Sequence, residues 1–288
     1  MLSIADALKR SKLLVSMSDT ARLDIEVLLS AVLQKSRAYL YTWPENHLSQ
    51  AQESLFNHYL QQRQQGQPIA YIVGSQEFWS LTLLVNNSTL IPRPETELLV
   101  ETVLALFSQD QPGLKRTAID LGTGTGAIAL ALATEKKHWQ ITAIDSVADA
   151  CALAESNRQQ HQLDNVTVLR SDWLQVMGEM AVDVIVSNPP YIDSNDPHLF
   201  QGDVRFEPRS ALIAADNGLA DIVVICQQAS QHLLPEGWLL IEHGYQQAEA
   251  VSSIFLNNGF MQVETRKDMV GHERITLGQW LPPKTNKQ

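Results

Sequence analysis

The chain alternates short apolar runs with longer helix-like segments from Arg116 to Asn258. Short apolar runs are typical of strands buried on both faces, as in a parallel sheet covered by helices. The runs are 117–120, 140–145, 166–169, 182–187 and 238–242, and the helix-like segments are 126–137, 148–161, 218–234 and 248–258. Because parallel strands need long crossovers, this alternation predicts a doubly wound α/β domain.

The end of the chain breaks this alternation. Residues 260–266 and 274–280 both have strand character, and only 267–273 lie between them, which is too short for a helical crossover. These two strands should therefore pair antiparallel. We expect an α/β fold that resembles class I S-adenosylmethionine-dependent methyltransferases: a Rossmann-like, mostly parallel sheet with an antiparallel C-terminal hairpin.

The first part of the chain has a different pattern, typical of a small helical bundle. Apolar residues of the segment 25–33 recur at helical spacing, and Ser49 and Gln52 form a capping-box signal for a second helix. The segment 69–85 then alternates around Phe78, Trp79, Leu81 and Leu83, which indicates a short hairpin or a linker. We predict an N-terminal helical domain at 1–73, a hairpin linker at 74–90 and a methyltransferase domain at 91–288.

Composition and charge limit the kinds of molecule that we expect this chain to bind. The net charge is −11, with 21 Lys and Arg against 32 Asp and Glu, and no basic patch is evident. This balance disfavours direct nucleic-acid binding, and no apolar stretch is long enough for a membrane span. The histidines and the two cysteines show no metal-ligand spacing, and Met1 is not followed by a signal-peptide pattern. We therefore expect a cytoplasmic protein without a metal.

A glycine turn joins the first strand of the alternating region to its helix. The turn runs from Asp120 to Gly126 and has the spacing G-x-G-x-G, with Thr123 and Thr125 between the glycines. Glycines permit a tight turn and let a ligand approach the backbone closely. The carboxylate of Asp120 beside the turn would repel a diphosphate but attract the ammonium group of S-adenosylmethionine.

Acidic residues also end the next two expected strands. Asp145 can accept hydrogen bonds from ribose hydroxyls, as it could in a nicotinamide-dependent enzyme. At the following strand end, Asp172 can accept from the adenine amino group and Trp173 can pack on the ring. Together these positions predict an S-adenosyl-L-methionine site, formed by the following residues: Asp120, Gly122, Thr123, Gly124, Thr125, Gly126, Asp145, Asp172, Trp173 and Asn188.

The tetrapeptide Asn188-Pro189-Pro190-Tyr191 follows the expected strand 182–187. The two prolines stiffen the segment and offer no N–H, so its backbone presents carbonyl acceptors. The Asn188 side-chain oxygen and the Pro189 carbonyl can accept both hydrogens of a planar NH2 group, and Tyr191 can cover its flat face. We therefore predict that Asn188, Pro189 and Tyr191 are catalytic and that Asn188 to Tyr191 bind the substrate.

With these residues in place, the chain resembles the release factor glutamine methyltransferase family (PrmC/HemK). The resemblance rests on the glycine turn, on Asn188–Tyr191 and on the following further segments: Ile91-Pro92-Arg93-Pro94-Glu95-Thr96-Glu97, Phe206-Glu207-Pro208-Arg209, Ile241-Glu242-His243-Gly244 and Glu273-Arg274-Ile275-Thr276-Leu277-Gly278. It implies methylation of the side-chain amide nitrogen (N5) of the glutamine in the Gly-Gly-Gln motif of class 1 peptide chain release factors.

The sequence leaves the roles of two regions open. The segment Ile91–Glu97 is either a proline-started helix or a wall of the active site, and Arg93, Glu97 and Glu207 have no assigned role. The N-terminal bundle either recognises the release factor or supports the catalytic domain.

Three other functions compete with this prediction. N-P-P-Y also suits the amino groups of adenine-N6 or guanine-N2, so a nucleic-acid methyltransferase is the main alternative. The glycine turn with Asp145 would also suit a nicotinamide-dependent oxidoreductase. A non-catalytic adaptor that binds a partner through the bundle is the third.

Overall fold

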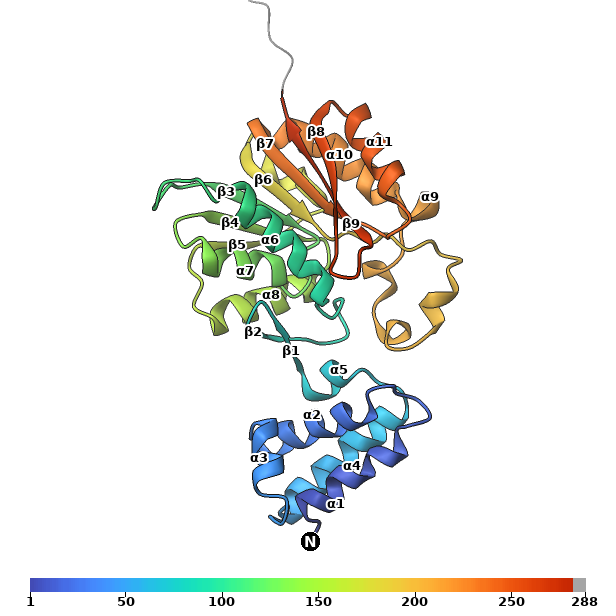
Figure 1. Cartoon of the computed structure of the whole chain (residues 1–288). Helices are drawn as coiled ribbons and strands as arrows, with labels where there is room; N and C mark the ends of the chain where they lie inside the picture. Colours follow the sequence, from blue (N-terminus) through green and yellow to red (C-terminus); the bar gives the residue numbers. More distant parts are fainter. Residues whose placement is uncertain (282–288) are drawn as a thin grey trace, which may run out of the picture. The chain divides into compact units, whose positions relative to one another are not determined.

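The computed structural model describes residues 1–281, which form two compact units (Figure 1). The first unit comprises Met1–Ser75 together with His198–Phe206. The second comprises Gln76–Pro197 and the described residues from Glu207 onward. Within residues 1–281, no helix is both long and apolar enough to cross a membrane.

The second unit contains a seven-stranded sheet in the order β5-β4-β3-β6-β7-β9-β8. The strands are β3 (Thr117–Leu121), β4 (Gln140–Asp145), β5 (Val166–Arg170), β6 (Val182–Ser187), β7 (Leu233–Glu242), β8 (Phe260–Lys267) and β9 (Glu273–Trp280). β3 to β7 run parallel, whereas β9 pairs antiparallel with both β7 and β8. The predicted Rossmann-like sheet with an antiparallel C-terminal hairpin is confirmed, although β7 begins five residues earlier than expected.

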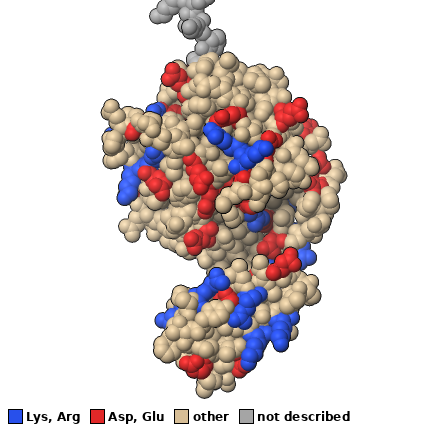
Figure 2. Space-filling model, in the orientation of Figure 1, with Lys and Arg blue, Asp and Glu red and all other residues tan. Residues whose placement is uncertain are grey.

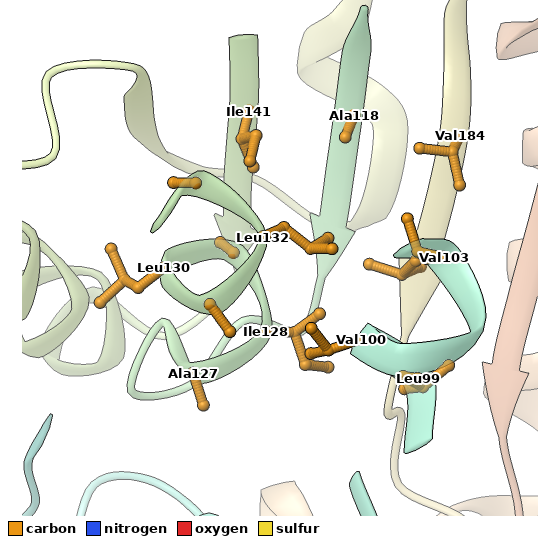
Figure 3. Close-up of a cluster of buried hydrophobic side chains, with 14 of the residues drawn as sticks. Leu99, Val100, Val103, Ala118, Ala127, Ile128, Leu130, Leu132, Ile141 and Val184 are labelled. Carbon is orange, nitrogen blue, oxygen red and sulfur yellow. The ribbon is translucent and has the colours of Figure 1, made fainter. Parts of the chain in front are cut away.

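Two apolar cores cover opposite faces of this sheet, because successive residues of a strand point to opposite sides. One core contains Ala118 of β3 with residues of α6 (Glu97–Leu106) and α7 (Ala127–Glu135). Figure 3 shows these helices packed against β3 and β6 through Val103, Leu132 and their neighbours. The other contains Ile119 with residues of α10 (Ala220–His232) and α11 (Ala248–Asn257).

A further helix and a hairpin of the second unit lie near the glycine turn. α8 (Ala148–Gln160) connects β4 to β5. The predicted hairpin is present as β1 (Ser75–Phe78) and β2 (Leu81–Leu84). Asn157 of α8 is fully buried, and its side chain hydrogen-bonds the backbone of Leu84 on both the N–H and the carbonyl. The same side chain donates to the carbonyl of Thr125, which ties the hairpin to the glycine turn.

The first unit is a helical bundle, as its sequence predicts. Its helices are α1 (Ile4–Lys9), α2 (Ala21–Leu33), α3 (Arg37–Thr42), α4 (Gln50–Gln64) and α5 (Ile69–Val73). The capping box at the start of α4 is present, with Ser49 and Gln52 each bonding the other's backbone N–H. Leu28, Leu29 and Phe56 are fully buried in the bundle's core.

A buried arginine ties a distant segment to this bundle. Arg63 of α4 donates to Asp24 of α2 at 2.8 Å and to Asp203 at 3.0 Å. Asp203 belongs to the segment His198–Phe206, which follows Asn188–Tyr191 along the chain and folds with the bundle. Nothing in the local pattern of either segment predicts this pairing.

We expect Arg63→Ala to lower the free energy of unfolding of the helical unit by about 3 kcal/mol, because it leaves the Asp24 carboxylate buried without its partner. Urea unfolding of the full chain measures this loss. Hydrogen exchange should also become faster at His198–Phe206.

The control is Lys9→Ala, which removes an exposed ion pair with Asp6 and should leave both measurements unchanged. Equal effects of the two substitutions would contradict a structural role for the buried pair.

Candidate active site

The glycine turn adopts a backbone conformation that favours glycine. Gly122, Gly124 and Gly126 have φ angles of 69°, 55° and 85°. A β-carbon added to Gly122 would lie 3.7 Å from the Trp173 ring and 4.0 Å from the backbone oxygen of Asn188. The turn, the indole and the start of the N-P-P-Y segment are therefore close neighbours.

Asp120 lies buried beneath the turn. Its Oδ2 accepts hydrogen bonds from the Thr123 hydroxyl at 2.6 Å and from the N–H of Ala129 at 3.1 Å. Its Oδ1 is buried and has no hydrogen-bond partner within residues 1–281. Burial, with a smaller effect of the Asp145 charge, raises the pKa of Asp120 to about 6. A nearby cation would offset the cost of holding this carboxylate ionised.

Asp145 lies at the end of β4 on the other side of the turn. Its two oxygens accept from the N–H groups of Gly124 and Val147, each at 2.9 Å. These bonds fix the carboxylate and leave lone pairs free to accept from hydroxyl groups. Asp172 and Trp173 follow β5, and Trp173 has a φ of 48°, an uncommon value for a side chain of this size.

An open cavity of about 260 Å³ lies over the carboxyl ends of these strands. Most of the residues predicted for the site line it: Gly122, Thr123, Gly124, Thr125, Asp145, Asp172, Trp173, Asn188 and Pro190. Four of the predicted residues do not line it: Asp120, Gly126, Pro189 and Tyr191. The structure thus brings most of the expected cofactor residues and the start of N-P-P-Y to a single cavity.

The Asn188 side chain is held from the segment before α6. Its Nδ2 donates to the Thr96 hydroxyl at 3.1 Å, and no hydrogen bond to its Oδ1 is found within residues 1–281. The Tyr191 hydroxyl donates to Oε1 of Glu242 at 3.3 Å. Burial and the Glu242 charge raise the pKa of Tyr191, which makes this residue a poor base at neutral pH.

The sequence left two interpretations open for the segment Ile91–Glu97, and the structure shows that both apply. Pro94–Thr96 is a 3-10 turn that leads into α6, as in a proline-started helix. Pro92, Arg93 and Thr96 also line the cavity. The segment is therefore a helix start and a cavity wall at once.

Glu207 anchors this segment. Its carboxylate accepts from Arg93 at 2.6 Å and from the N–H of Ile91 at 3.1 Å. Glu97 in turn accepts from the N–H of Trp79 at 2.8 Å. Arg93, Glu97 and Glu207 thus hold the wall in place.

Two further residues support Tyr191, and sequence reasoning missed both. The Gln247 side chain donates to the Tyr191 carbonyl at 3.0 Å and accepts from the N–H of Gly244. Gly218, with a φ of 83°, packs so closely that a β-carbon would lie 2.1 Å from the same carbonyl. The sequence suggested that Gly218 begins a helix, but it ends the short α9 (Ala215–Gly218), and α10 begins at Ala220.

Comparisons with known proteins agree with this geometry. Residues 6–74 match the PrmC N-terminal domain, and residues 94–204 match the Methyltransferase small domain. A methyltransferase structure from Pyrococcus furiosus superposes with a TM-score of 0.54 over 78% of this chain and 99% of its own. At 17% identity, this likeness shows the fold alone.

Sequence relatives decide the family. A release factor glutamine methyltransferase of Shewanella oneidensis is 51% identical over 96% of both chains. One from Pseudomonas aeruginosa is 53% identical over 97% of this chain and 99% of its own. The chain belongs to the release factor glutamine methyltransferase family. As a member of that family it is an S-adenosylmethionine-dependent methyltransferase, which confirms the predicted enzyme class and cofactor.

The residues of the cavity fit that cofactor. The lining of the cavity includes the fixed carboxylate of Asp145, which can accept from hydroxyl groups, and the indole of Trp173. Asp120, one oxygen of which has no hydrogen-bond partner among the described residues, supplies negative charge near the expected place of an ammonium group. Within residues 1–281, no cluster of three or more His, Cys, Asp or Glu side chains could hold a metal ion.

We expect Gly218→Ala to reduce methyl transfer by about 10- to 100-fold in kcat/KM, because the new methyl group must displace the Tyr191 backbone. The measurement is initial rates at saturating S-adenosylmethionine, with thermal unfolding recorded in parallel.

Gly113→Ala is the matched control. Gly113 has a φ of 84°, but no atom of the described part of the chain lies within 4 Å of an added β-carbon, so this variant has only the conformational strain. Equal activity in the two variants would contradict the role given to Gly218.

Proposed function

We propose that this enzyme methylates the N5 side-chain amide nitrogen of the glutamine in the Gly-Gly-Gln motif of class 1 peptide chain release factors. One observation carries the proposal: Asn188 lies on the wall of the cofactor cavity with its NH2 group bonded to Thr96, which leaves its Oδ1 as an acceptor. An acceptor in this place suits a substrate NH2 group. The relatives' names supply the glutamine and the release factor.

The residues act mainly by positioning. A carboxamide nitrogen is a weak nucleophile, because its lone pair is delocalised into the carbonyl. Hydrogen bonds to Asn188 Oδ1 and to the Pro189 carbonyl hold the glutamine NH2 and favour pyramidal geometry at nitrogen. Pro190 and Tyr191 pack against the glutamine side chain of the substrate. Holding two reactants in line is worth up to about 7–11 kcal/mol, so these contacts supply much of the rate.

S-adenosylmethionine supplies a methyl group on a positively charged sulfur. The new N–C bond forms as the S–C bond breaks, and the nitrogen then loses one proton to solvent. Since the nitrogen becomes acidic only after it gains the methyl group, no strong base is needed beforehand. This suits Tyr191, whose raised pKa keeps its hydroxyl protonated.

We assign the catalytic domain to residues 91–288, the helical domain to 1–73 and a hairpin linker to 74–90. Residues 282–288 of that domain lie outside the described part of the chain. The release factor is a cytoplasmic protein substrate, and we place the enzyme in the same compartment. The helical domain is proposed to support the catalytic domain or to bind the release factor.

Charge argues against nucleic acid as the substrate. On the face of the second unit that Figure 2 shows, Lys and Arg are interspersed with Asp and Glu. Residues 86–288 carry the whole net charge of −11, because seven basic and seven acidic residues cancel before them. A nucleic-acid methyltransferase needs a surface that attracts phosphates.

The direct test is mass spectrometry of a release factor after incubation with the enzyme and S-adenosylmethionine. We expect one added methyl group on the Gly-Gly-Gln peptide and none on a substrate whose glutamine is replaced by alanine. Parallel incubations with ribosomal RNA and DNA should give no product. Methylation of nucleic acid alone would overturn the proposal.

In the same assay, Asn188→Ala should lower kcat by about 100-fold, since it removes the acceptor that orients the amide. Asn195→Ala is the control, because Asn195 is an exposed residue a few positions later whose side chain bonds Asp193. Unchanged activity in Asn188→Ala would remove the proposed site.

A further inference from the structure

The turn between β8 and β9 presents two large apolar side chains to solvent. Met269 is fully exposed, and Val270 is 76% exposed. Apart from Met1 at the start of the chain, no large apolar residue within 1–281 is as exposed as these two. Single exposed apolar residues are ordinary, but two consecutive ones at the end of a turn form a candidate contact surface. We call Met269 and Val270 the apolar tip.

The backbone of this turn is fixed by Asp268 and not by the two apolar side chains. Oδ1 of Asp268 accepts from the N–H groups of Val270 at 3.1 Å and of His272 at 2.8 Å. The N–H of Asp268 donates to the His272 carbonyl at 2.8 Å, and Arg274 donates to Oδ2 at 3.2 Å. A fixed turn loses little conformational entropy when a partner binds. The apolar tip is therefore preorganised, and its side chains can be replaced without breaking these bonds.

The turn lies at the same end of the sheet as the N-P-P-Y segment. β9 runs antiparallel to β7, and Glu242 at the end of β7 pairs with Ile275, which follows the turn closely. The N-P-P-Y segment leaves β6, the neighbour of β7, at its carboxyl end. Strand order and register therefore place the apolar tip beyond the carboxyl ends of the parallel strands, where the cavity also lies.

A series of side-chain contacts leads from the turn to Tyr191. The His272 ring lies 5.1 Å from the ring of Tyr245, which is half-exposed. Gln247, two residues after Tyr245, donates to the Tyr191 carbonyl at 3.0 Å. Burial raises the pKa of Tyr191, and the charge of Arg274, which follows the turn, opposes this rise. The turn is therefore close to the end of N-P-P-Y that we assign to the substrate.

A Gly-Gly-Gln loop offers an enzyme little to hold. Its two glycines have no side chains, and the cavity of about 260 Å³ must also take the cofactor. Much of the binding energy for a protein substrate must therefore come from surfaces outside the cavity. Exposed apolar side chains beside the site supply such a surface, because burial of apolar area drives association.

We propose that the apolar tip binds an apolar surface of the release factor beside its Gly-Gly-Gln loop. The inference rests on the function proposed above. Met269 and Val270 do not line the cavity, so they act on the binding of the protein substrate and not on methyl transfer itself. A second copy of this chain is the competing occupant.

The first experiment measures the kinetics of methylation of the full-length release factor. The double variant Met269→Ser with Val270→Ser should raise KM for the release factor about tenfold and leave kcat unchanged, because it removes contacts that serve binding alone. Met269→Leu keeps an apolar side chain and should retain the wild-type KM. The affinity for S-adenosylmethionine, measured by calorimetry, and the thermal unfolding midpoint should stay the same in each variant.

Met261→Ser is the matched control. Met261 is 52% exposed and lies on the same hairpin, at the opposite end of β8. This variant should keep the wild-type KM for the release factor. An unchanged KM in the double variant, or an equal rise in Met261→Ser, would overturn the proposal.

The second experiment does not depend on methylation. The variant Met269→p-benzoylphenylalanine, irradiated with purified release factor, should cross-link to segments that flank the Gly-Gly-Gln loop. No cross-link, or one only to a second copy of the enzyme or to a remote part of the release factor, would overturn the proposal. If the expected cross-link forms but the glutamine is not methylated, the proposed function fails while the binding surface stands. If the glutamine is methylated without this cross-link, the binding surface is wrong and the proposed function stands.

Discussion

The parallel register of β3, β6 and β7 is the constraint on which the site depends. Ser187 pairs with Leu121 on one side and with Ile241 on the other, and its hydroxyl donates to the Leu121 carbonyl at 2.8 Å. The next residues are therefore Gly122 after β3, Asn188 after β6 and Glu242 at the end of β7. They lie side by side at the carboxyl ends of the three strands. A slip of one residue would turn every side chain of a strand to the opposite face.

The carboxyl ends of these strands hold two buried carboxylates, at a place where apolar side chains would make the fold more stable. Asp120 and Glu242 are both almost fully buried, and their pKa values are raised to about 6 and about 7. Such groups destabilise a fold unless they are hydrogen-bonded or face a cation. They lie on β3 and β7, the two strands that flank β6, and function explains their presence there: Asp120 lies beneath the glycine turn, and Glu242 accepts a hydrogen bond from Tyr191 of the N-P-P-Y segment.

Local patterns predicted the fold and the cavity, but not the contacts between distant segments. Strand ends, the glycine turn and the capping box each depend on a few consecutive residues, so they can be read from the sequence. Asn188 and Thr96 are 92 residues apart, and Arg63 and Asp203 are 140 apart. No local rule pairs such side chains, because their proximity exists only after the sheet and the bundle have formed. The Ile91–Glu97 segment stayed ambiguous for the same reason.

The central claim is that Asn188 presents its oxygen to the substrate amide. A crystal structure with S-adenosylhomocysteine and a Gly-Gly-Gln peptide measures this most directly. The glutamine side-chain nitrogen should lie about 2.9 Å from Asn188 Oδ1 and face the cofactor sulfur, with Asn188 Nδ2 still on Thr96. A glutamine bound elsewhere, or a nitrogen more than about 4 Å from that oxygen, would contradict the account.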